Sequence, residues 1–154
     1  MIQNVGTSAA GAIQVDATES LAIQGNSLEG LAISEIRAES LGDGKGADIA
    51  IGTQKLTIRD GAQVAARTFG SASGGNTNIR TTDQVEVSGF SPSNPAFSSR
   101  LGTGNYGTAG SSGNVSISTD RLFVRDGGSI ATVSFGVSAG GNLTVEAAEL
   151  VELS

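Results

Sequence analysis

Two copies of an Arg-Asp-Gly tripeptide, Arg59–Gly61 and Arg125–Gly127, carry the residues best suited to chemistry. If they stack two repeat units apart, Asp60 and Asp126 are about 10 Å from each other, near the carboxyl separation of inverting glycoside hydrolases. Asp-Gly is also a turn pair, in which Asp bonds nearby backbone and Gly supplies a positive φ. Ser88 occupies the unit between them, so we favour structural turns. The residue order excludes an integrin-type Arg-Gly-Asp motif.

Three further motifs favour a structural interpretation. Gly102–Gly107 matches the dinucleotide fingerprint, but it lies in a Gly/Ser-rich loop rather than between a strand and a helix. Asp43–Asp48 is similar to a calcium-binding nonapeptide, although it does not recur at that period. Asn114 and Asn142 begin glycosylation sequons, but both also fall in a repeated Asn column that suggests a ladder of mutually bonded amides.

Phe69 and Phe135 occupy matching positions, with Phe97 and Ile33 at the same offset in other units. We interpret them as an inner stack rather than a ligand platform. The chain has no His and no Cys, which excludes Ser/His/Asp and Cys/His catalytic arrangements, His-based metal sites and thiolate metal sites. We therefore predict no catalytic residues, no cofactor-binding residues and no metal ligands.

The composition narrows the class of partner. The formal net charge is −6 over 154 residues, and no basic run exceeds one residue. This argues against nucleic acid and anionic membrane surfaces as partners. No apolar stretch reaches the length that spans a bilayer, so we expect no membrane insertion. The first residues lack the pattern of a signal peptide, so we expect any export signal to lie outside this chain.

An internal repeat organises the chain. Leu56–Val64 recurs as Leu122–Ile130 at an offset of 66 residues (122 − 56), and this offset holds from Ala47/Gly113 to Ser88/Ser154. A repeated unit is normally a structural layer that stacks on its neighbours. The 23 Gly residues and the many small β-branched residues indicate short strands separated by tight turns.

Shorter units appear when the chain is aligned on three columns. The units begin near residues 12, 48, 76, 114 and 142, at spacings of 36, 28, 38 and 28 residues. The first column lies at the start of the units and contains Ala12, Asp48, Asn76, Asn114 and Asn142. The second column is aliphatic and contains Val15, Ile51, Ile79, Ile117 and Val145. The third column is glycine and contains Gly25, Gly61, Gly89 and Gly127. Such regular columns predict units that stack directly on one another.

Period-two alternation predicts three short strands per unit, as in 142–146, 150–153 and 129–134. We expect loops at 25–46 and 89–112 to project from one continuous stack, although Leu28–Ser40 also suits a short helix. Residues 1–10 fit the end of an earlier unit, with Ile2 and Val5 directed inward. The predicted fold class is all-β, a single-stranded parallel β-helix (solenoid) of about five rungs of three short strands.

The repeats resemble those of filamentous haemagglutinin-like exoproteins, particularly those of cyanobacteria. The motifs are Gly113–Ile117, Leu122–Ile130, Ser134–Gly136 and Gly140–Asn142, with a second set at Ala47–Ile51, Leu56–Val64, Thr68–Gly70 and Gly74–Asn76. The likeness covers about residues 11–154, although Ala47-Asp48 and Ala12 depart from its Gly-Asn pattern. It implies a right-handed parallel β-helix that a two-partner secretion transporter of the outer membrane exports for cell adhesion.

From the resemblance and the columns we expect one segment, 1–154, of a longer exoprotein. It would be a structural shaft and binding segment of a secreted, cell-surface adhesin, without catalysis. Its partners would be host cells, surfaces or polysaccharide, the neighbouring rungs of the parent chain, and the transporter through a region absent here. The alternative is a β-helical polysaccharide lyase or glycoside hydrolase, which predicts clustered Asp, Arg and Lys along one exposed groove.

Overall fold

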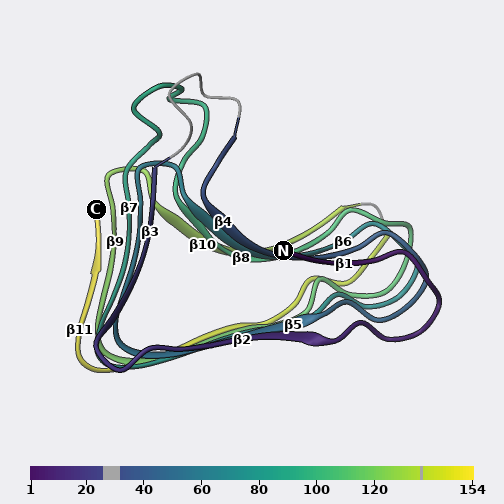
Figure 1. Ribbon diagram of the computed structural model, residues 1–154, viewed down its shortest axis with the longest axis horizontal. Helices are drawn as coiled ribbons and strands as arrows, with labels where there is room; N and C mark the ends of the chain where they lie inside the picture. Colours follow the sequence, from purple (N-terminus) through teal and green to yellow (C-terminus); the bar gives the residue numbers. More distant parts are fainter. Residues whose placement is uncertain (26–31, 136) are drawn as a thin grey trace.

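The computed structural model describes residues 1–25, 32–135 and 137–154, and within these ranges it consists of strands and loops with no helix (Figure 1). The strands form two largely parallel sheets, one of six strands and one of five. Figure 1 looks along the direction in which the units stack, so that equivalent strands overlap. The all-β prediction is therefore confirmed.

The strands of the six-stranded sheet pair in the order β11-β9-β7-β5-β2, with β3 also paired to β5. Their bounds are β2 (Ala12–Asp16), β3 (Ser20–Gln24), β5 (Asp48–Arg59), β7 (Thr77–Ser88), β9 (Val115–Arg125) and β11 (Leu143–Leu153). The five-stranded sheet, in the order β1-β4-β6-β8-β10, contains β1 (Ile2–Asn4), β4 (Glu35–Ser40), β6 (Gln63–Thr68), β8 (Arg100–Asn105) and β10 (Ser129–Ser134). Each of the units that begin near residues 48, 76 and 114 thus adds one strand to each sheet.

The register of the six-stranded sheet confirms the aliphatic column. Ile51 lies opposite Ile79, Ile79 opposite Ile117, and Ile117 opposite Val145. Val15 begins the column opposite Ile51. The predicted starts and spacings of the units therefore match the pairing of adjacent parallel strands.

Alternating residues of both sheets fill the space between them. Ile49, Leu56 and Ile58 of β5 are 0% exposed, as is Val64 of β6. Equivalent aliphatic residues in the other units extend this core along the stack. Because successive strands repeat the same alternation, each unit buries its inner face against the units above and below it.

The prediction of a single-stranded β-helix with rungs of three short strands is wrong. The structure has two sheets, and the first two expected strands of a unit are one continuous strand of 11 or 12 residues in β5, β7, β9 and β11. Only the first unit divides this path, into β2 and β3, which both pair with β5. The long strands turn the corner by bending, with register shifts at the bend (Figure 1).

Threonine explains why the chain bends there without a break. Thr53 lies opposite Thr81 in the register, and both side chains are nearly buried, as is Thr119 in the next unit. The Thr81 hydroxyl donates to Thr119 Oγ1 at 2.6 Å, and the Thr119 hydroxyl donates to the Arg121 carbonyl at 3.1 Å. A β-branched residue keeps the backbone extended, and its hydroxyl satisfies backbone that the bend would leave unpaired.

Both predicted loops contain a central strand of the five-stranded sheet. β4 lies within 25–46 and β8 within 89–112, and each pairs with β6. The part of the second range that precedes β8 projects beyond the body (Figure 1). The short helix considered at Leu28–Ser40 is wrong for residues 35–40, which are strand, while residues 28–31 lie outside the described residues.

At the N-terminal end Ile2 packs against the core, as predicted, but Val5 is 73% exposed. The Asn column forms a ladder of a different kind from the one expected. Each side-chain oxygen accepts a hydrogen bond from the backbone N–H of the next unit, at 2.7 Å from Asn76 to Asp48, 2.9 Å from Asn114 to Asn76, and 2.8 Å from Asn142 to Asn114. Asp48 can therefore substitute for Asn, since only an acceptor oxygen is required.

Candidate functional site

The Arg-Asp-Gly motifs are tight turns. Asp60 and Gly61 have φ of 59° and 86°, and Asp126 and Gly127 have φ of 52° and 84°. The bonds from Ala62 N–H to Arg59 O (3.2 Å) and from Gly128 N–H to Arg125 O (2.9 Å) close the two turns. Positive φ at both central positions is typical of the mirror image of a type I turn, which favours Asp-Gly. The predicted turn geometry of both motifs is confirmed, and the glycine column has positive φ throughout.

The other motifs also have structural partners. Gly102–Gly107 lies largely within β8 and does not join a strand to a helix, so it lacks the context of a dinucleotide site. The Asp43 carboxylate accepts hydrogen bonds from the Ser71 hydroxyl at 2.7 Å and from its backbone N–H at 3.2 Å. These bonds hold the pKa of Asp43 below its ordinary value of 3.8. Its carboxylate therefore joins adjacent units.

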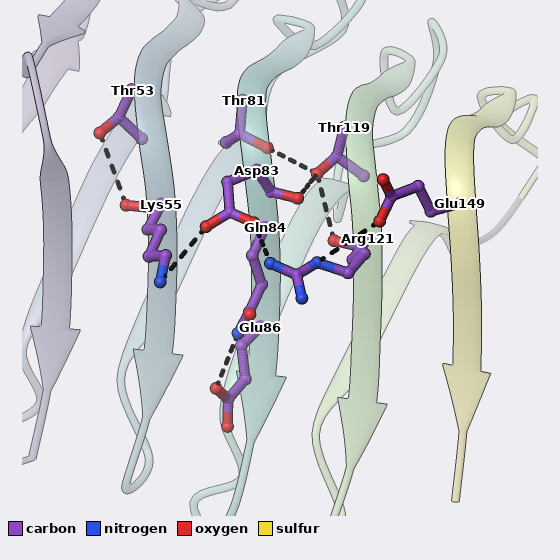
Figure 2. A network of polar contacts seen from close by, with 9 residues as sticks. All are labelled: Thr53, Lys55, Thr81, Asp83, Gln84, Glu86, Thr119, Arg121 and Glu149. Atoms are coloured by element: carbon purple, nitrogen blue, oxygen red, sulfur yellow. Dashed lines mark hydrogen bonds and ion pairs between the residues drawn. The ribbon is translucent and has the colours of Figure 1, made fainter.

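A row of alternating charges crosses four adjacent long strands just after the bend (Figure 2). Lys55 Nζ lies 3.2 Å from Asp83, Arg121 bonds the same carboxylate, and Arg121 Nε lies 4.0 Å from Glu149. The hydrogen bond from Arg121 holds the pKa of Asp83 below its ordinary value of 3.8, in opposition to desolvation and with support from Lys55. We call these four residues the charge ladder.

A second row runs parallel to the charge ladder. Arg125 donates to Glu86 Oε1 at 2.9 Å, and the Ser88 hydroxyl donates to the same oxygen at 3.0 Å. Burial disfavours the Glu86 carboxylate, but the bonds from Arg125 and Ser88 and the charge of Arg59 outweigh burial, and the pKa of Glu86 falls below 4.5. The same pairing raises the pKa of Arg125.

The 66-residue repeat explains the alternation. Lys55 and Arg121 are related by this offset (121 − 55), as are Asp83 and Glu149 (149 − 83). β5 and β9 therefore form basic units, and β7 and β11 form acidic units. Opposite charges on adjacent strands stabilise a sheet, whereas like charges directly opposite destabilise it. The sequence analysis did not identify this alternation of basic and acidic units, although the 66-residue offset relates the residues that form it.

The aromatic residues form an exposed row, so the prediction of an inner stack is wrong. Phe69, Tyr106 and Phe135 are 43%, 42% and 55% exposed. The Phe69 and Tyr106 rings stack with centroids 5.2 Å apart, and the Tyr106 and Phe135 rings stack at 5.3 Å. Phe97 and Ile33 are only half-buried and do not share the row, because the insertions before β4 and β8 shift the offset.

A short sequence motif, a large apolar residue followed by glycine, marks the position of this exposed aromatic row in every unit. The short strands β1, β4, β6, β8 and β10 are each followed by a large apolar residue and then glycine: Val5-Gly6, Leu41-Gly42, Phe69-Gly70, Tyr106-Gly107 and Phe135-Gly136. All five apolar side chains are exposed. We call Val5, Leu41, Phe69, Tyr106 and Phe135 the apolar ridge.

A shallow hollow lies beside the apolar ridge on the outer face of β6, β8 and β10. Its floor is made of small residues in register, Ala65, Gly102 and Ala131. Tyr106 lines it and folds back over β8, since a Cβ at Gly104 would lie 2.6 Å from Tyr106 Cε2.

Two arginines line the same hollow. Arg67 donates to Gln63 at 2.6 Å and lies 3.9 Å from Glu35. The Arg100 guanidinium has neither a hydrogen bond nor an ion pair to any residue that the structure describes. The lining includes no carboxylate, so the arrangement suits stacking and binding of anionic groups rather than acid–base chemistry.

Comparison of the chain with protein-family models, curated proteins and solved structures gives no match. Across 1–25, 32–135 and 137–154, no helix has the length and hydropathy of a membrane span. In the same part of the chain, no cluster of three or more acidic residues could hold a metal ion. The fold and the site therefore define the class only as an all-strand protein of two parallel sheets with a charge ladder and an apolar ridge.

Proposed function

We propose that this chain is a structural and binding segment of a secreted, surface-associated adhesin that attaches cells to a surface or to polysaccharide. The observation that carries the proposal is the apolar ridge beside the Arg100 hollow. Exposed aromatic rings and an unpaired guanidinium next to small floor residues are suited to an extended ligand that offers both ring faces and hydroxyl or anionic groups.

The regular stack supports the structural part of this role. The charge ladder and the Asn column bond each unit to the next at the surface, while the aliphatic columns do so inside. Because every unit repeats the ridge position, a ligand that spans several units makes several weak contacts, and their combined strength exceeds that of one. The proposal includes no catalytic step.

The location of the protein is part of the proposal and rests on the resemblance to two-partner secretion exoproteins. It places the chain outside the cell or at its surface, after export through an outer-membrane transporter that recognises a region absent from these 154 residues.

The test is retention of the purified protein on immobilised acidic and neutral polysaccharides, with attachment of protein-coated beads to cells as a second readout. We expect Tyr106→Ala and Arg100→Ala each to weaken retention by roughly tenfold, since each removes about 1–1.5 kcal/mol of contact. Phe90→Ala and Arg80→Ala are matched controls, because Phe90 is also an exposed ring and Arg80 also lacks a described ion pair.

The controls should bind like the parent protein. Equal loss in Tyr106→Ala and Phe90→Ala, or no retention on any polysaccharide or cell, would remove the ridge as a binding site. Depolymerisation of the polysaccharide that is abolished by Asp60→Asn or Asp126→Asn would instead support the enzymatic alternative.

A further inference from the structure

The hollow on the outer face of β6, β8 and β10 has a polar side and an aromatic side. Its polar side is a row of residues that lie opposite one another in the register, Gln63, Arg100 and Ser129. The small floor residues come next along the strands, and the ring of Tyr106 borders the far side. Because these rows cross the strands, they run along the stacking direction, which is the viewing direction of Figure 1.

The polar row offers an unpaired positive charge. The Arg100 side chain is exposed and has no ion pair with any residue that the structure describes. Its two neighbours in the register are uncharged. Glu35 lies one strand beyond Gln63, but its carboxylate is 3.2 Å from Arg37 and 3.9 Å from Arg67. The acid of this row is therefore already paired, and the charge of Arg100 remains available to a ligand.

The size of the hollow limits the group that can enter it. Its volume is about 40 Å³, which is room for roughly one or two water molecules. A carboxylate fits this space, whereas a sugar ring does not. A carboxylate that is bonded directly to a sugar ring can therefore reach Arg100 while the ring stays outside. The planar guanidinium also matches the two oxygens of a carboxylate.

Tyr106 is placed to contact the ring that stays outside. Its side chain folds back over β8, so that its hydroxyl oxygen lies 3.2 Å from the position of a Cβ at Gly104. This hydroxyl makes no hydrogen bond to any described residue. An aromatic ring with a free hydroxyl offers a sugar both an apolar surface and a polar group. The rings of successive units are 5.2 and 5.3 Å apart, which is comparable with the length of one sugar in an extended chain.

We propose that the hollow binds a linear polysaccharide that contains uronate sugars and runs along the stack. The carboxylate of one sugar pairs with Arg100, and the ring of the same sugar packs against Tyr106. The sugars on either side lie over β6 and β10, beside Phe69 and Phe135. This inference rests on the proposed function, because it names the chemical class of the ligand at the same site.

The probe is a labelled oligomer of galacturonic acid, titrated with the full chain and followed by fluorescence anisotropy at physiological ionic strength. Salt at this level screens repulsion from the net charge of −6 beyond about 8 Å, but it leaves a pair in contact largely intact. The matched control is the same oligomer with its carboxyl groups methyl-esterified, which keeps the rings and removes the charge. We expect the ester to bind roughly tenfold more weakly than the acid.

Variants of the protein show whether Arg100 recognises the carboxylate. Arg100→Gln should bind the acid and the ester equally, with the affinity that the parent protein has for the ester. Arg100→Lys should keep part of the preference, because it retains the charge and loses the planar fork. Tyr106→Ala should weaken binding of both oligomers by a similar factor and keep the preference. Both side chains are exposed, so unchanged thermal melting serves as the check of folding.

Equal affinity of the parent protein for the acid and the ester would overturn this inference and leave the proposed function standing. Tighter binding of dextran sulfate than of the galacturonate oligomer would also overturn it, because the hollow would then not select a carboxylate. Polyglutamate has carboxylates without sugar rings, and its binding with the affinity of the galacturonate oligomer would exclude a polysaccharide-specific site. Absence of retention on every polysaccharide would overturn the proposed function as well.

Discussion

Three of the glycines that follow ridge residues, Gly42, Gly70 and Gly107, lie against the backbone of the neighbouring unit. A Cβ at Gly70 would be 1.9 Å from Gly42 O, and a Cβ at Gly107 would be 1.9 Å from Gly70 O. Real Cβ atoms do not approach oxygen so closely, so any side chain here must push two units apart. At this scale, glycine beside the ridge lets the backbones of neighbouring units approach closely.

Gly70→Ala should therefore destabilise the protein by about 1–3 kcal/mol, since the added methyl group meets backbone that cannot rotate away. Gly140→Ala is the matched control, because a Cβ there meets nothing within 4 Å. Urea unfolding followed by circular dichroism measures both. Equal stability of the two variants would show that the units are not packed as closely as the structure places them.

At the scale of strands, the sequence predicts register better than it predicts where strands end. Period-two alternation and the 66-residue offset were enough to align Ile51, Ile79, Ile117 and Val145 correctly. The bend at Thr53 and Thr81 was missed because turns are usually marked by Gly, Pro or Asn, whereas this corner is made by buried threonine hydroxyls.

The candidate site was predictable only in part. The Asp60 and Asp126 turns follow from local chemistry, since Asp-Gly favours positive φ. The ridge was missed because a fixed offset from the glycine column led to Phe97, whereas Tyr106 completes the row after an insertion of different length. The hollow at Arg100 depends on which strands become neighbours in the five-stranded sheet, and this pairing has no local sequence signal.

Acid should weaken the carboxylate contacts that join neighbouring units. The pKa of Glu86 lies below 4.5 in the folded protein, and the pKa values of Asp83 and Asp43 lie below 3.8. A carboxylate with a depressed folded pKa contributes its full stabilisation above its unfolded value and loses it as pH falls through the folded value. We therefore expect Tm to fall by several degrees between about pH 5 and about pH 3.

Thermal melts over this pH range provide the measurement, with Glu86→Gln as the control. The variant should start from a lower Tm near neutral pH and show a shallower decline, because one of the responsible carboxylates is gone. A parent protein whose Tm rises on acidification would mean that these carboxylates do not stabilise the folded state through their basic partners.

For the whole molecule, stacking concentrates basic charge in the middle and leaves both ends acidic or neutral. All nine Lys and Arg residues lie between Arg37 and Arg125. Units inside the stack can therefore alternate in charge, and Glu149 of β11 continues the alternation through its contact with Arg121. This arrangement stabilises the pairing of neighbouring long strands.

The central claim is that units far apart in sequence stack in register, and the absence of Cys allows a direct test. Asn78 of β7 lies opposite Ser116 of β9, and Ser116 lies opposite Thr144 of β11. Adjacent strands are about 4.8 Å apart, within reach of a disulfide, whereas strands two apart are about 10 Å apart and out of reach.

The measurement is the yield of intramolecular disulfide on mild oxidation of the Asn78→Cys/Ser116→Cys variant, with Asn78→Cys/Thr144→Cys as the control. We predict rapid closure in the first variant and none in the second. Closure of the Asn78–Thr144 pair, or failure of the Asn78–Ser116 pair in a folded protein, would contradict the stacked register on which the ridge and the charge ladder depend.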